Sequence, residues 1–271
     1  MHRLLASLLL ALGLAGTPAS AGQFVDIPGG TQESPVRVVG YLSRPPGDGP
    51  FPAVVLLHGC GGFHAPMLSW ADRLSRWGYA ALAVDSFGTR NIENYCTGLV
   101  STYQALDAYA ALRWLQDKSF VRPSRIAVMG FSQGGWAVLD ALDKGLMEHL
   151  FPHKFRAGIA FYPLCKHTSG IMTRPVLVLI GDADTWTPAA DCEAMAAGRS
   201  ASGAPRLPGD RSMVELVVYP GVHHGFDQLD LSLAPTRGIT IKGHRAEFNE
   251  EATRNSIVRV RNFLQQTIGG P

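Results

Sequence analysis

The sequence is poor in charged residues, and its positive and negative charges nearly cancel. Only 17% of the 271 residues are Asp, Glu, Lys or Arg, and the formal net charge is +2. No dense run of Lys and Arg occurs, so the chain lacks the basic footprint of a nucleic-acid-binding protein. We therefore expect no nucleic-acid partner.

Cysteine is also scarce, and its spacing excludes the common metal and redox motifs. The four cysteines are Cys60, Cys96, Cys165 and Cys192, and no two of them form a Cys-x-x-Cys pair. Neither a zinc ribbon nor a thioredoxin-like redox centre is therefore expected. We expect no metal and no other cofactor.

Apart from a short stretch near its start, the chain has no long apolar run. The exception, Leu4 to Ala15, follows the basic start Met1-His2-Arg3 and precedes the small residues Thr17 to Ala21. This order is typical of a cleaved export signal, and the run is short for a membrane anchor, which is the alternative. We expect residues 1–21 to be a signal peptide, residues 22–271 to form one domain, and the protein to be periplasmic or secreted.

Strand-like and helix-like segments alternate along the rest of the chain. Short aliphatic runs predict buried strands, and apolar residues recurring every three or four positions predict helices. The predicted strands are 36–42, 53–57, 80–84, 125–129, 157–161, 175–180 and 214–219, and the predicted helices are 68–77, 99–115, 135–146, 188–197 and 249–266. This alternation predicts an α/β fold, with a mostly parallel central sheet and helices on both faces. Residues 201–211 are expected to form a surface loop.

The pentapeptide Gly130-Phe131-Ser132-Gln133-Gly134 lies between a predicted strand and a predicted helix. Gly-x-Ser-x-Gly at such a junction is typical of a sharp turn that exposes the serine hydroxyl as a nucleophile. A side chain at either glycine would collide with the neighbouring backbone. The sequence therefore predicts that Ser132 attacks a carbonyl carbon.

A serine hydroxyl is a weak nucleophile, so it needs a base, and the base needs an acid to orient it. The base candidates are His224 and its neighbour His223, in a glycine-flanked loop after the last predicted strand. The acid candidates are Asp184 and Asp182, which follow the preceding predicted strand; Asp182 could instead be a turn residue. The chain order Ser, Asp, His is that of α/β-hydrolase sheets. Surface positions are expected for Asp191, His149, His153 and His244.

The negative oxygen of a tetrahedral intermediate needs N–H donors. One is expected from Gln133, which follows the nucleophile, and the other from Cys60 in the loop His58-Gly59-Cys60-Gly61-Gly62. The four cysteines allow three pairings. We favour Cys60–Cys96 and Cys165–Cys192, because each member follows a predicted strand or opens the next element at the same sheet edge. The first bridge would then pin the loop that carries Cys60.

Aromatic residues on the loops at this sheet edge predict a pocket for an apolar or aromatic acyl or alcohol group. The expected lining residues are Phe63, Phe87, Tyr95, Trp186 and Phe226. The chain has no long insertion that could form a large lid. Short or soluble esters are therefore expected as substrates rather than long-chain lipids.

From about residue 36 to residue 264, the chain resembles the dienelactone hydrolase family of α/β-hydrolases. The motifs that carry the resemblance are His58-Gly59-Cys60-Gly61-Gly62, Asp85-Ser86-Phe87-Gly88, Gly130-Phe131-Ser132-Gln133-Gly134-Gly135, Gly181-Asp182-Ala183-Asp184 with Pro188, and His224-Gly225-Phe226. The resemblance implies an α/β-hydrolase fold in a single domain. It also implies that Ser132, Asp184 and His224 form the catalytic triad.

Three departures from the family pattern change the expected substrate. The name-giving enzymes have a cysteine where this chain has Ser132, a glutamate near the position of Gly59, and arginines for an anionic lactone where this chain has Asp227 and Gln228. Arg90 is the candidate to replace one arginine. We expect a monomeric serine esterase for small or soluble esters or lactones, and not for dienelactone itself. The alternatives are a peptidase or acyltransferase with the same triad, and a non-catalytic binding protein on the same scaffold.

Overall fold

An eight-stranded sheet runs through the computed structural model, which describes residues 22–30, 35–93, 96, 102–199, 213–234 and 238–270. Its strands are β1 (Gln23–Gly30), β2 (Pro35–Ser43), β3 (Phe51–Leu57), β4 (Ala80–Asp85), β5 (Val121–Phe131), β6 (Ala157–Phe161), β7 (Val176–Gly181) and β8 (Val214–Tyr219). Their order is β1-β2-β4-β3-β5-β6-β7-β8. The pairs from β4 to β8 are parallel, whereas β2 runs antiparallel to both β1 and β4. The predicted α/β fold with a mostly parallel sheet is confirmed.

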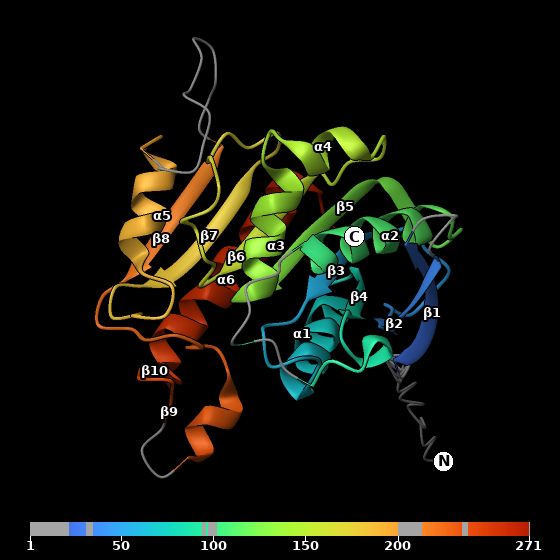
Figure 1. Cartoon of the computed structure of the whole chain (residues 1–271). Helices are drawn as coiled ribbons and strands as arrows, with labels where there is room; N and C mark the ends of the chain where they lie inside the picture. Colours follow the sequence, from blue (N-terminus) through green and yellow to red (C-terminus); the bar gives the residue numbers. More distant parts are fainter. Residues whose placement is uncertain are drawn as a thin grey trace, which may run out of the picture.

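Helices cover both faces of this sheet. The helices are α1 (Ala65–Arg76), α2 (Thr102–Gln116), α3 (Gln133–Leu142), α4 (Leu146–Leu150), α5 (Ala189–Ala196) and α6 (Glu250–Thr267), with the short 3-10 turns η1 (Gly88–Arg90) and η2 (Leu229–Leu233). Figure 1 shows α2 and α3 in front of the sheet and α6 behind it. The guanidinium of Arg261 in α6 lies over the ring of Trp77 at the end of α1, 5.7 Å from its centroid. Helix α1 therefore lies beside α6, on the face opposite α2 and α3.

The central strands are the most continuous apolar runs because helices bury them on both faces. Every residue of β6 and β7 is buried, and so is all of β3 except Phe51. Strand β1 was not predicted. It lies at the sheet edge, is mostly exposed, and carries Asp26 and Pro28, which sequence patterns assign to loops.

The observed bounds of the helices differ from the predicted ones by up to four residues. Helix α3 stops at Leu142 and not at residue 146, because Asp143 is extended and its carboxylate accepts hydrogen bonds from Ser169. Helix α6 begins after Asn249, whose side chain accepts a hydrogen bond from the Ala252 N–H at 2.9 Å. The start of the predicted helix 99–115, the predicted loop 201–211, Tyr95 and the predicted signal peptide lie outside the described residues.

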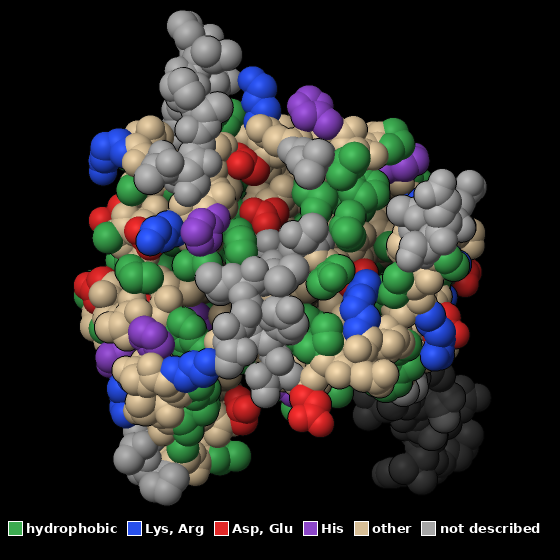
Figure 2. All heavy atoms as spheres, viewed as in Figure 1, with side chains coloured by type: hydrophobic (Ala, Val, Ile, Leu, Met, Phe, Trp, Pro, Cys, Tyr) green, Lys and Arg blue, Asp and Glu red, His purple; other side chains and the backbone are tan. Residues whose placement is uncertain are grey.

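A small lobe, not predicted from the sequence, lies along the chain between the loop that carries His224 and α6. It consists of η2 and a hairpin of β9 (Gly238–Ile241) with β10 (His244–Glu247), and it projects below the body in Figure 1. The Glu247 N–H donates to the His224 carbonyl at 3.0 Å, so the hairpin packs directly on this loop. Figure 2 shows hydrophobic side chains gathered on the lobe, where Leu229 and Leu233 are exposed.

Among the described residues, no helix has both the length and the apolar character that a bilayer crossing requires.

Candidate active site

Ser132 occupies a sharp turn between β5 and α3. Its φ of 53° and ψ of −114° lie in a region of backbone angles that residues other than glycine rarely adopt. A Cβ added to Gly130 would lie 2.1 Å from the Gly134 carbonyl oxygen, and one added to Gly134 would lie 2.4 Å from the Leu57 oxygen. Only glycine fits at these two positions, as predicted. The Ser132 N–H donates to the Phe161 carbonyl at 2.9 Å, which holds the turn against β6.

His224 connects Ser132 to Asp184 through its two ring nitrogens. Nε2 lies 3.0 Å from Ser132 Oγ, and Nδ1 lies 2.7 Å from Asp184 Oδ2. A carboxylate only accepts hydrogen bonds, so Nδ1 carries the proton and Nε2 can accept the serine hydroxyl proton. His224 and Asp184 are both buried, whereas Ser132 is partly exposed. The serine is therefore the end of this chain that a substrate can reach.

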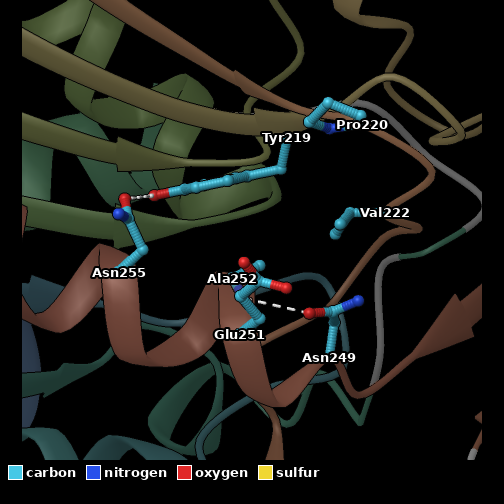
Figure 3. Close-up of a pocket in the computed structure, with 7 residues that line it drawn as sticks. All are labelled: Tyr219, Pro220, Val222, Asn249, Glu251, Ala252 and Asn255. Carbon is cyan, nitrogen blue, oxygen red and sulfur yellow. Dashed lines mark hydrogen bonds between the residues drawn. The ribbon is translucent and has the colours of Figure 1, made fainter.

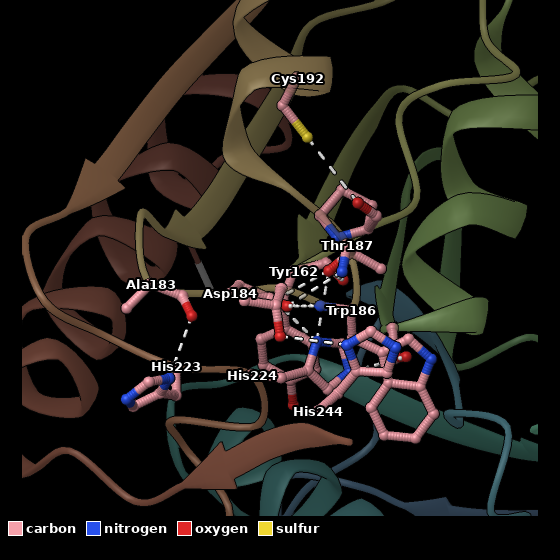
Figure 4. A network of polar contacts seen from close by, with 12 residues as sticks. Tyr162, Ala183, Asp184, Trp186, Thr187, Cys192, His223, His224 and His244 are labelled. Carbon is pink, nitrogen blue, oxygen red and sulfur yellow. Dashed lines mark hydrogen bonds and ion pairs between the residues drawn. The ribbon is translucent and has the colours of Figure 1, made fainter. Parts of the chain in front are cut away.

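Asp184 is held in place by Trp186 and Thr187, which lie in its own turn. Its Oδ1 accepts the N–H groups of Trp186 and Thr187, each at 2.9 Å, and the Thr187 hydroxyl lies 2.8 Å from Oδ2 (Figure 4). Burial alone would raise the pKa of Asp184, but the hydrogen bond and charge of His224, together with both Thr187 donors, hold that pKa below its ordinary value. The role of Thr187 was not predicted, although an Asp that accepts the backbone N–H two residues on is typical of such a turn.

The alternative base and acid point elsewhere. Nδ1 of His223 lies 3.0 Å from the Ala183 carbonyl, and Figure 4 shows this ring turned away from the cluster around His224. Asp182 accepts the N–H of Gly221 at 2.6 Å, which is the turn role considered for it from the sequence. Of the candidates, the structure brings His224 and Asp184 to Ser132.

A buried histidine supports the loop that is expected to bind the negative oxygen. Nε2 of His58 accepts the Ser86 N–H at 3.2 Å, so Nδ1 carries the proton and donates to the Gly59 carbonyl at 2.7 Å. Gln104 Nε2 of α2 donates to the His58 carbonyl at 2.7 Å. Burial lowers the pKa of His58 to about 4, so its ring is neutral at neutral pH. Neither His58 nor Gln104 was predicted to take this part.

The same loop lies directly against Ser132. A Cβ added to Gly59 would lie 3.5 Å from the Cβ of Ser132, so Cys60 follows at the rim of the serine turn. Cys60 is bonded to Cys96, and the other bridge joins Cys165 to Cys192. These are the two pairings favoured from the sequence. Gln133, the other expected donor, is the first residue of α3.

Two of the expected mouth residues, Trp186 and Phe63, are partly exposed. The half-buried ring of Trp186 lies 5.1 Å from that of His224 and stacks on His244 at 5.6 Å. His244 is partly exposed, which agrees with the surface position expected for it. Phe63 is partly buried, and its ring lies 6.2 Å from the exposed ring of Phe24.

Phe87 and Phe226 were expected at the mouth but lie in the interior. Phe226 is fully buried and packs edge-on against the ring of Tyr162 at 5.5 Å. Phe87 is 3% exposed and packs edge-on against His58 at 4.5 Å. Both rings act as packing beneath the loops, because large apolar side chains gain most from leaving water entirely.

Arg90 is held in an ion pair inside the protein. Its two terminal nitrogens lie 2.7 and 2.8 Å from the carboxylate oxygens of Asp107, and one of them also donates to the Ser86 carbonyl at 2.5 Å. Because Asp107 and Ser86 engage both terminal nitrogens, Arg90 joins η1 to α2. This arrangement contradicts its expected role as a free arginine for an anionic substrate.

A cleft of about 300 Å³ lies on the far side of the His224 loop, between the end of β8 and the start of α6 (Figure 3). Its lining residues are Tyr219, Pro220, Val222, Asn249, Glu251, Ala252 and Asn255. The Tyr219 hydroxyl donates to Asn255 Oδ1 at 3.0 Å across the cleft. None of the three residues Ser132, His224 and Asp184 lines it, so the cleft is separate from the candidate active site.

The model of the dienelactone hydrolase family matches residues 38–268. A Bradyrhizobium protein named as a probable 2-oxo-3-(5-oxofuran-2-ylidene)propanoate lactonase is 26% identical over 211 residues, which cover 69% of this chain and 78% of that protein. A Bacillus subtilis protein named as a hydrolase, YtaP, is 33% identical over 189 residues, covering 52% of this chain and 63% of that protein.

Solved structures share the fold at low sequence identity. The dienelactone hydrolase-like promiscuous phosphotriesterase P91, from metagenomic libraries, has a TM-score of 0.70 at 21% identity and covers 92% of this chain and 100% of that one. Esterase 2 of Thermogutta terrifontis, phosphorylated by paraoxon, has a TM-score of 0.65 at 18% identity, with 92% and 95% covered. These likenesses show the same α/β-hydrolase architecture.

Proposed function

Since the chain belongs to the dienelactone hydrolase family of carboxylic-ester hydrolases, we propose that Ser132, His224 and Asp184 are its nucleophile, base and orienting acid. The observation that carries the proposal is the pair of hydrogen bonds that join Asp184 Oδ2 to His224 Nδ1, and His224 Nε2 to Ser132 Oγ. A binding protein on the same scaffold would not need all three groups in this order. The strained turn at Ser132 supports the same conclusion, since such strain persists where a function requires it.

In the proposed reaction, Ser132 Oγ attacks the ester carbonyl carbon while its proton passes to His224 Nε2. The carbonyl oxygen becomes negative and accepts hydrogen bonds from the backbone N–H groups of Cys60 and Gln133. Asp184 stabilises the charged imidazolium. As the carbon–oxygen bond to the alcohol breaks, Nε2 returns the proton to the leaving oxygen and an acyl-serine remains. Water then attacks this ester by the same route, releasing the acid and restoring Ser132.

We propose small or soluble esters or lactones as the substrates. The ring of Trp186 beside His224 offers an apolar wall to an acyl or alcohol group. Arg90 is paired with Asp107, which disfavours a substrate that needs a free arginine for its carboxylate. Among similar proteins, one is named as a lactonase, and the Thermogutta esterase has been solved with propionate and with butyrate. Short acyl groups are therefore the first substrates to test.

We propose further that the protein is exported. The basic start, the apolar run and the small residues before Gly22 support a cleaved signal. Two disulfides also favour an oxidising compartment, because such bridges are rare in the cytosol.

A p-nitrophenyl ester series from acetate to decanoate, together with paraoxon, tests the proposed chemistry. We expect Ser132→Ala to lower kcat/KM by about 10⁴-fold or more, because the nucleophile is lost. Paraoxon should form a phosphorus–oxygen bond to Ser132 Oγ with release of p-nitrophenolate, seen as a single diethylphosphoryl adduct by mass spectrometry. Ser69→Ala, which changes an exposed serine on α1, is the matched control and should behave as the intact protein does.

The outcomes separate the rival functions. Labelling of Ser132 without hydrolysis of any ester would favour a peptidase or acyltransferase. A folded protein that neither reacts with paraoxon nor cleaves an ester would refute a catalytic role for Ser132.

A further inference from the structure

A second carboxylate, Asp227, lies three residues after His224. Asp227 keeps some exposed surface, but both oxygens of its carboxylate point inward to buried donors. Oδ1 accepts the Tyr162 hydroxyl at 2.6 Å, and Oδ2 accepts the Trp70 indole N–H at 2.9 Å. Both donors are neutral. Among the described residues this carboxylate has no direct ion pair, and an enclosed carboxylate is costly unless a positive charge nearby compensates it.

Tyr162 connects this carboxylate to the triad. Its φ of 36° is unusual for a tyrosine, and its N–H donates to the Leu179 carbonyl at 2.7 Å. Its ring lies 4.6 Å from the ring of His224, and its carbonyl accepts the Thr187 hydroxyl at 3.1 Å. That hydroxyl also lies 3.2 Å from His224 Nδ1. Tyr162 thus contacts His224 with its ring while its hydroxyl holds Asp227.

We propose that Asp227 is a positioning residue of the reaction: through Tyr162 it supports the His224 ring, and its negative charge stabilises the imidazolium that forms when His224 takes the Ser132 proton. This inference rests on the proposed function. Asp227 contacts neither the substrate nor Ser132 in the proposed reaction, so it acts only through His224. In this arrangement Asp184 serves His224 by a direct hydrogen bond, and Asp227 serves it through space.

The surrounding charges agree with this role. The groups that face His224 are Asp184 on the loop after β7, Tyr162 after β6 and, beyond Trp186, His244 of β10. Asp227 is influenced in addition by Arg73 of α1, whose guanidinium lies 5.5 Å from the ring centre of Trp70. Burial raises the pKa of Asp227, while Tyr162, Trp70 and the charge of His224 oppose that rise. Burial and the Asp227 charge together raise the pKa of Tyr162 well above its ordinary value, so its hydroxyl remains a donor.

The test is the pH dependence of kcat/KM for a p-nitrophenyl ester in the intact protein and in Asp227→Asn. The acid limb of this profile reports protonation of the free base. Loss of the Asp227 charge removes a stabilising partner of the imidazolium, so we expect the acid limb to move to lower pH by about half a unit or more. We expect kcat on the plateau to fall about tenfold with KM unchanged, because only the step that charges His224 is weakened.

Two matched variants separate charge from structure. Asp227→Glu keeps the charge and should keep the acid limb close to that of the intact protein. Trp70→Phe removes one hydrogen bond to Asp227 but leaves the carboxylate, so it should lower stability without moving the acid limb. Should Asp227→Asn fail to fold, Asp227→Ser removes the same charge with a smaller side chain and carries the same two expectations.

An acid limb that stays in place in a folded, uncharged variant would overturn the inference, whether or not stability falls, and so would an equal shift in Trp70→Phe. These failures differ from failure of the proposed function. In the latter case the intact protein itself would neither cleave esters nor be labelled by paraoxon at Ser132.

Discussion

His58 supports the loop beside Ser132 only while its imidazole ring is neutral. Its Nε2 accepts a backbone N–H from Ser86, so a proton on that nitrogen would turn an attraction into a repulsion. The ring is fully buried, and burial lowers its pKa to about 4, below the value of about 6.5 expected in an unfolded chain. The folded loop after β3 therefore requires a neutral imidazole.

This requirement predicts how stability depends on pH. Below about pH 6.5 the unfolded chain binds a proton at His58, whereas the folded chain binds one only below about pH 4. The stability that the neutral His58 contributes is therefore complete at neutral pH and is lost as the pH falls. At pH 5 the loss should be about 2 kcal/mol. Urea unfolding at pH 7.5 and pH 5 measures it, with His58→Asn as the reference that lacks the titrating group. A stability difference between the two proteins that is the same at both pH values would contradict the prediction.

Single residues also show where sequence patterns suffice and where they fail. Ser132 could be predicted because its turn needs a glycine on both sides, and both glycines occur within five consecutive residues of the sequence. The contributions of His58 and Asp227 could not, because each depends on contacts with a distant segment. Phe87 and Phe226 were expected at the mouth because they lie on loops at the same sheet edge as Ser132. A position on a loop does not say whether a ring points outward or into the core.

At the scale of elements, each part of the site comes at the carboxyl end of a strand. Ser132 follows β5, Asp184 follows β7, and His224 follows β8, so a parallel sheet brings three distant loops to one edge. This placement was predictable, because buried parallel strands are short aliphatic runs. The edge strand β1 and the β9–β10 hairpin were not predictable in the same way. Few of their residues are buried, so they lack the continuous aliphatic run that identifies the central strands.

The two disulfides tie different elements, which predicts different consequences of their removal. Cys60–Cys96 fastens the loop beside Ser132, whereas Cys165–Cys192 fastens the segment after β6 to α5. We expect Cys60→Ser with Cys96→Ser to lower kcat about tenfold, because the proposed oxyanion donor at Cys60 loses its fixed position; loss of such a donor outright costs about 10²–10³-fold.

Cys165→Ser with Cys192→Ser is the matched control, since the bridged segments are of similar length, 36 and 27 residues apart. It should lower stability by a similar amount and kcat by less than about twofold. Steady-state kinetics well below both unfolding temperatures measures the contrast. An equal fall of kcat in both variants would show that the first bridge has no special bearing on the active site.

At the scale of the whole molecule, the disulfides and the predicted signal peptide both indicate that the chain folds in an oxidising compartment. Each bridge should stabilise the fold by about 3–4 kcal/mol by restricting the unfolded chain. That is a large share of the 5–15 kcal/mol by which native proteins are usually stable. A chain that depends on two such bridges should reach full stability only after export to an oxidising compartment.

Expression of residues 1–271 in an exporting bacterium tests this statement directly. We expect N-terminal sequencing of the recovered protein to begin at Gly22, and thiol titration in denaturant to find no free cysteine. The same domain made without residues 1–21 and kept reduced should unfold at lower urea, with a loss of stability close to the sum of the two bridges, because their loops are separate in the chain. Four free thiols in the exported protein, or a reduced protein as stable as the oxidised one, would contradict both the compartment and the stabilising role of the bridges.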